Sequence, residues 1–219
     1  MRSGLEYDME SFSNLTSKGE PFDLKLNEEI FMNKEDGFFI ELGAFDGIIQ
    51  SNTAFFERYK NWSGILIEAS REKYSECVEN RPNSKCFNTA CSNFDDYEVT
   101  FNHENGMMSK VVDGGEYTCK TTTLETILNT CKVDRNIDFL SLDVEGYELE
   151  VLKGLNLCKY RPNYMLIELW DDNEYDVKTF LQDNNYRCLE NYSKYNKIAN
   201  PTWGDCGFHN DFLFKDNKL

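Results

Sequence analysis

The chain has 219 residues, which is enough for one domain of ordinary size with a continuous apolar core. Its formal net charge of −16 predicts a surface that repels phosphate backbones, so nucleic acid is not expected as a partner. The eight cysteines stand singly without zinc-type spacing, and no apolar run approaches the ~18 residues of a membrane span. Free thiols, a cytoplasmic location and no membrane partner are therefore expected.

The apolar pattern predicts an α/β fold. Residues 1–36 are expected to form an N-terminal arm followed by a short helix at 22–33, and residues 37–219 the main domain. Strands are predicted at 37–42, 64–69, 85–90, 137–143, 164–169 and 208–214, with helices at 71–80, 146–155, 176–184 and between the first two strands. This alternation predicts a mostly parallel sheet with helices on both faces. Residues 97–122 break it and are predicted to be an insertion.

Acidic residues recur at the carboxyl ends of the predicted strands, as Glu41, Glu68, Asp143 and Glu168. Ligands of an open parallel sheet bind outside these strand ends. A carboxylate is costly to bury there without a partner. The set therefore predicts a ligand that carries hydroxyls and positive charge.

The first strand leads into the loop ELGAFDG at residues 41–47. Gly43 and Gly47 permit close backbone approach, but the GxGxxG spacing of a dinucleotide site is absent. Glu41 and Asp46 place negative charge where a pyrophosphate would lie, which favours a ligand with an amino group and a sulfonium. Glu68 lies 68 − 47 = 21 residues beyond the loop, close to the ~20-residue offset of an acidic group that binds ribose hydroxyls.

The sequence resembles the FkbM-type methyltransferases from about residue 37 to 168. The resemblance rests on GFFIELGAFDG, SNT at 51–53, GILIEAS, NTACSN, GMMS at 106–109, TTLETIL and FLSLDVEGYELEVLKG. It implies a Rossmann-like class I methyltransferase fold with a seven-stranded sheet, S-adenosylmethionine as methyl donor, and O-methylation of hydroxyls, often on sugars. It also implies that residues 17–20 fold back near the cofactor.

Candidate site residues follow from the strand ends together with this resemblance. Asp143 is the leading candidate for the general base, Glu145 should share its pocket, and His103 and His209 are alternative bases. Glu145 can also be interpreted as complementing a helix dipole. The candidate cofactor-binding residues are Glu41, Gly43, Ala44, Asp46, Gly47, Ser51, Asn52, Glu68, Ala69, Ala90, Cys91 and Asp143.

Several alternatives stay open at this point. Asp143, Glu145 and Glu168 could hold a divalent cation, but no spacing requires one, so no metal is predicted. The acceptor could be a metabolite other than a sugar. A nicotinamide-dependent oxidoreductase would share the first loop, although the third glycine is missing, and a binding module could have kept the fold without catalysis. The acceptor pocket is expected to draw on Met107, Met108, Tyr117, Trp170 and Trp203.

Overall fold

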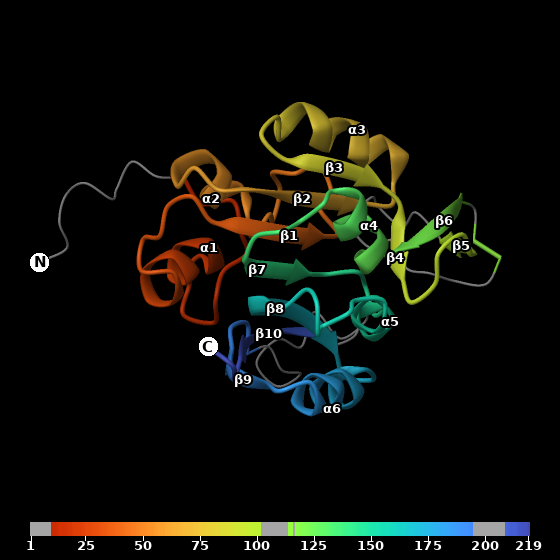
Figure 1. Cartoon of the computed structure of the whole chain (residues 1–219). Coiled ribbons are helices and arrows are strands. Elements are labelled where there is room, and N and C mark those ends of the chain that lie inside the picture. The colour runs from red at the N-terminus through yellow and green to blue at the C-terminus, as the bar shows by residue number, and fades with distance from the viewer. Residues whose placement is uncertain (1–9, 102–113, 116, 195–208) are drawn as a thin grey trace, which may run out of the picture.

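A seven-stranded sheet forms the centre of the computed structural model, which describes residues 10–101, 114–115, 117–194 and 209–219 (Figure 1). The strand order is β3-β2-β1-β7-β8-β10-β9, and all neighbours pair in parallel except around β10, which is antiparallel to β8 and β9. The strands are β1 (Phe38–Leu42), β2 (Ser63–Glu68), β3 (Lys85–Asn88), β7 (Ile137–Leu142), β8 (Pro162–Trp170), β9 (Tyr186–Asn191) and β10 (His209–Asp216). The predicted fold class is confirmed.

Helices cover both faces of this sheet, because successive side chains of a strand point to opposite faces. In β1, Phe39 packs with Phe22 and Phe55, whereas Ile40 packs with Leu128 and Leu152 on the other face. The first face carries α1 (Phe22–Lys25), the π-helical turn η1 (Leu26–Ile30), α2 (Ala54–Tyr59) and α3 (Arg71–Asn80). The second carries α4 (Leu124–Thr130), α5 (Glu148–Lys153) and α6 (Glu174–Asp183).

A smaller three-stranded sheet stands beside the main one, with the order β4-β6-β5 (Figure 1). Its strands are β4 (Ala90–Ser92), β5 (Glu98–Phe101) and β6 (Tyr117–Thr123). The predicted strand at 85–90 is therefore too long, because β3 ends at Asn88 and Ala90 already pairs with β6. Thr89 fixes this change of direction by donating a hydrogen bond from its hydroxyl to the Lys120 carbonyl at 2.9 Å.

Two further element predictions need correction. Strand β9 is missing from the prediction. Apart from Tyr186 its side chains are exposed or partly exposed, so the sequence shows no apolar run there, and its strand conformation depends on pairing with β10. The helix predicted from residue 146 begins only at Glu148, because Glu145 and Gly146 have φ angles of 58° and 98°, which a right-handed helix cannot accommodate.

Two expectations from composition concern cysteines and membrane spans. The cysteines within the described residues, Cys77, Cys86, Cys91, Cys119, Cys131, Cys158 and Cys188, are all free thiols, and Cys206 lies outside these residues. Within the same residues, no helix combines the length and the apolar character that crossing a bilayer requires.

Candidate active site

A cavity of about 300 Å³ opens at the carboxyl ends of the central strands. The loops after β1, β2 and β7 line it together with Glu168 of β8, the small sheet contributes Ala90, Cys91 and Phe101, and Asn14 reaches it from the N-terminal segment. This is the edge at which ligands of open parallel sheets bind. Among the residues that the structure describes, the lining includes no lysine or arginine, so its charged side chains are acidic apart from His209.

The loop after β1 owes its course to Gly43. Gly43 has a φ of 75°, and a Cβ at this position would lie 1.8 Å from the backbone oxygen of Asp143. The loop can therefore lie against the end of β7 only with glycine here. The backbone amides of Gly43 and Ala44 both donate to the Ile67 carbonyl, at 3.1 and 3.2 Å, which also fixes the loop to the end of β2.

Glu41 points into a buried ion-pair network rather than toward the cavity. Its carboxylate accepts hydrogen bonds from the Ser51 hydroxyl, the Thr53 hydroxyl and the Asn52 amide, the shortest at 2.6 Å. Arg81, which is 2% exposed, lies 3.5 Å from Glu41 Oε2 and donates to Glu57 Oε2 at 2.8 Å. The network therefore neutralises Glu41 within the protein and shapes the loop from behind.

Glu68 ends β2 with its carboxylate on the cavity. Its two oxygens accept from the backbone amides of Phe45 and Ser70, at 2.8 and 2.7 Å. Desolvation raises the pKa of Glu68 above its ordinary value, although these two amides and Lys73 oppose the shift. Each carboxylate oxygen can accept more than one hydrogen bond, so Glu68 retains capacity for ligand hydroxyls.

A tight turn after β7 holds Asp143 and Glu145 in place. Glu148, which is fully buried, accepts through Oε1 from the amides of Val144 and Gly146, at 3.1 and 3.0 Å. The side chain of Asn173 donates to the other Glu148 oxygen at 2.6 Å. Glu148 thus stabilises the left-handed conformation of Glu145, and it, not Glu145, lies in the first turn of α5.

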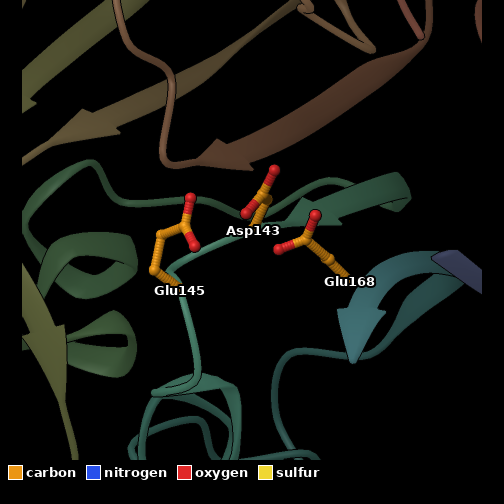
Figure 2. Close-up of side chains that lie close together, drawn as sticks. All are labelled: Asp143, Glu145 and Glu168. Carbon is orange, nitrogen blue, oxygen red and sulfur yellow. The ribbon is translucent and has the colours of Figure 1, made fainter. Parts of the chain in front are cut away.

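Asp143, Glu145 and Glu168 gather their carboxylates at one end of the cavity (Figure 2). One oxygen of each lies within 4.8 Å of the others. Desolvation, followed by the neighbouring carboxylates, raises the pKa values of Asp143 and Glu168 well above their usual range. The sequence placed acidic residues at several strand ends, and the structure shows that Asp143, Glu145 and Glu168 lie together.

Strand β10 adds two residues to this end: Asp211, which the sequence did not assign to the site, and His209, an alternative candidate for the base. Asp211 pairs with Glu168 across the strands and accepts a short hydrogen bond from the Ser193 hydroxyl, and its burial raises its pKa to about 6. His209 places Nδ1 3.5 Å from Glu168 Oε1. Asp211 could have been found from the sequence, because it interrupts an apolar run in the same way as Glu68 and Asp143 do.

The predicted cofactor residues divide into two sets by position. Those that line the cavity are Gly43, Ala44, Ser51, Glu68, Ala69, Ala90, Cys91 and Asp143. Glu41, Asp46, Gly47 and Asn52 do not line it and hold the loop from behind: Asp46, for example, accepts from the amides of Ile48 and Ile49. Glu145 lines the cavity, and His103 lies outside the described residues. From the described part of the N-terminal segment, Asn14 lines the cavity and residues 17–20 do not.

The sheet order and the cavity at its carboxyl edge are those of a class I methyltransferase fold. Fibrillarin from Aeropyrum pernix, solved with S-adenosylmethionine, is similar with a TM-score of 0.50 and 13% identity, covering 88% of this chain and 72% of that one. A TehB-like methyltransferase from Corynebacterium glutamicum has a TM-score of 0.49 and 7% identity, covering 91% of each chain. A search of curated protein sequences returned no match.

A sequence model of the methyltransferase FkbM domain matches residues 41–188, and the chain belongs to this family. It is a methyltransferase, and its cofactor is S-adenosylmethionine. The residues present fit that cofactor. Glu68 would offer its carboxylate to the ribose hydroxyls, Gly43 would permit close approach of the backbone, and Ile49 would supply apolar lining for the adenine base.

Proposed function

We propose that this chain is an O-methyltransferase that methylates a hydroxyl of a sugar or glycan. The observation that carries the proposal is the group of carboxylates at one end of the cavity, on Asp143, Glu145 and Glu168. A hydroxyl acceptor must donate a hydrogen bond and then lose its proton, and carboxylates provide for both. The net charge of −16 supports a small molecule or glycan rather than a nucleic acid, and the described free thiols support a cytoplasmic location.

Methyl transfer to a hydroxyl is an in-line displacement, so orientation of the acceptor provides much of the rate. When bound, S-adenosylmethionine supplies a methyl group attached to a positively charged sulfur, and this sulfur keeps the electron pair of the broken S–CH₃ bond and becomes a neutral thioether. The acceptor oxygen gains the methyl carbon, and Asp143 accepts the proton that this oxygen loses. A positioned base of this kind contributes about 10²- to 10⁴-fold.

Aromatic side chains that line the cavity support a sugar as the acceptor. Phe101 lines the cavity and stacks on Tyr117 with ring centroids 5.9 Å apart and an interplanar angle of 24°, and Tyr147 also lines the cavity. Aromatic faces pack on the apolar face of a sugar ring, and carboxylates bind its hydroxyls. Trp170 is 6% exposed and serves packing, whereas Met107, Met108 and Trp203 lie outside the described residues.

The proposal is tested by incubating the protein with S-adenosylmethionine and a panel of mono- and oligosaccharides, and by measuring methylated products by mass spectrometry. We expect Asp143→Asn to retain most of the cofactor affinity and to lose about 10²- to 10⁴-fold in turnover. Glu150→Gln, a carboxylate of α5 that pairs with Lys153 at 2.7 Å, is the matched control and should retain activity. Full activity of Asp143→Asn would remove the proposed base.

Thermal shifts distinguish the other candidate functions. S-adenosylmethionine and S-adenosylhomocysteine should both stabilise the protein, and NAD should not. Stabilisation by NAD would favour an oxidoreductase. Stabilisation by the two adenosyl compounds without methylation of any hydroxyl acceptor would favour a binding module, and methylation only of non-sugar hydroxyls would replace the proposed substrate class.

A further inference from the structure

We infer that Asp143, Glu145 and Glu168 hold a hard divalent cation of the Mg²⁺, Mn²⁺ or Ca²⁺ kind, which binds the hydroxyl of the acceptor. This inference rests on the proposed function, because the cation would lie at the acceptor end of the cavity. It departs from the sequence, in which nothing requires a metal. What the sequence cannot show is that the end of β7, the turn after it and the end of β8 bring one carboxylate oxygen each to within 4.8 Å of one another (Figure 2).

The span of these oxygens matches the size of such a cation. Ligands on opposite sides of Ca²⁺ lie about 4.6–5.2 Å apart, and those of Mg²⁺ about 4.0–4.2 Å apart. An oxygen separation of up to 4.8 Å falls within the span of Ca²⁺ ligands, whereas around Mg²⁺ the most distant pair would have to draw together by about 0.6 Å or more. Carboxylate oxygens are also the ligands that these cations prefer, and water or an acceptor hydroxyl would complete the coordination.

Glu168 gives the second, independent observation. Its side chain is 9% exposed, and Oε2 is buried without a hydrogen-bond donor among the residues that the structure describes. Figure 2 shows this carboxylate directed toward that of Asp143. A buried carboxylate oxygen without a hydrogen-bond partner lowers the stability of the folded protein, because it has lost its hydration and gained no partner in return. A cation between the two carboxylates satisfies that oxygen and removes their repulsion.

The described part of the protein supplies little positive charge here. Within the described part of the chain, no lysine or arginine lines the cavity, and the nearest base is His209, whose Nδ1 lies 3.5 Å from the other Glu168 oxygen. Asp211, across from Glu168 on β10, adds a further carboxylate to the same end. The cofactor carries its positive charges on two separate groups, the sulfonium and the ammonium. Three carboxylates that lie together are better neutralised by one divalent ion between them.

The cation and the proton acceptor are compatible at Asp143. Each of the three residues contributes a single oxygen to the cluster, so Asp143 keeps its second oxygen for the proton of the acceptor. The cation would hold the acceptor oxygen in place and stabilise the negative charge that develops when the proton leaves. No electron transfer is involved.

Calorimetric titration of the protein with MgCl₂, MnCl₂ and CaCl₂, in the presence of S-adenosylhomocysteine, tests the site without any need for turnover. We expect binding of one ion to the wild type, weakened about tenfold or more in Glu168→Gln and in Glu145→Gln. Glu150→Gln, the same change at a carboxylate paired with Lys153, should bind as the wild type does. Glu145 lies in a partly exposed turn, so its variant tests the site even if Glu168→Gln does not fold.

The outcomes separate this inference from the proposed function. Absence of ion binding, together with methylation that survives exhaustive chelation, would overturn the cation site and leave O-methylation intact; a proton shared between Asp143 and Glu168 would then explain the cluster. Equal binding by the wild type and both cluster variants would also overturn it. Ion binding that depends on the cluster without methylation of any hydroxyl would support the site and reject the function.

Discussion

Glu41 and Glu168 both lie near the carboxyl ends of apolar central strands, but the protein handles their charges differently. Glu41 lies in a network with Arg81, two hydroxyls and a backbone amide, whereas Glu168 lies among further carboxylates on the cavity. A buried carboxylate that already has a cation serves the structure, and one that lacks it is available to a ligand. The difference separates the charge network that supports the loop from the carboxylates that we propose to act on the acceptor.

The largest effect is expected when the guanidinium of Arg81 is removed from the network around Glu41. Arg81 is 2% exposed and binds Glu57, Gly47 and Ser51 as well as lying beside Glu41. We expect Arg81→Met to lower the free energy of unfolding by about 3–5 kcal/mol, because it leaves buried carboxylates unpaired. Urea denaturation followed by circular dichroism measures the change.

A surface pair provides the control for Arg81. Lys120 and Asp96 lie 3.5 Å apart with side chains 71% and 84% exposed. Lys120→Met should change the free energy of unfolding by no more than about 1 kcal/mol. If Arg81→Met were as mild as Lys120→Met, the buried network would not be what supports the cofactor loop.

The sequence predicted both regions equally well as strand ends, and it could not tell them apart. The alternation of apolar runs located the sheet, the loop at Gly43 and the carboxylates of Glu68 and Asp143. The partner of Glu41 is a single arginine beyond α3, and no motif or spacing connects the two. Glu148 was missed for a similar reason, since its role depends on the left-handed turn at Glu145 and Gly146.

A smaller effect is expected at Glu68, whose carboxylate lines the cavity. Glu68→Ala removes a charged hydrogen-bond acceptor for the cofactor, which is worth about 1.5–3 kcal/mol, or one to two orders of magnitude in the dissociation constant. Isothermal titration calorimetry with S-adenosylhomocysteine measures it. Glu76→Gln, a change at a carboxylate of α3 that pairs with Lys73, is the control and should bind normally. Unchanged affinity of Glu68→Ala would remove Glu68 from the cofactor site.

The smallest expected effect is the pH dependence that Glu68 gives to cofactor binding. Desolvation raises its pKa, with the amides of Phe45, Ser70 and Ala69 and the charge of Lys73 opposing the shift. The ionised carboxylate would accept hydrogen bonds from the ribose hydroxyls, so affinity should be full above this raised pKa and fall as the pH drops through it. The limiting slope is about tenfold, or 1.4 kcal/mol, per pH unit. In Glu68→Gln, binding should be weaker but should lose this component of the slope. A pH profile of the dissociation constant that is the same in the variant and the wild type would assign the slope to other carboxylates of the cavity.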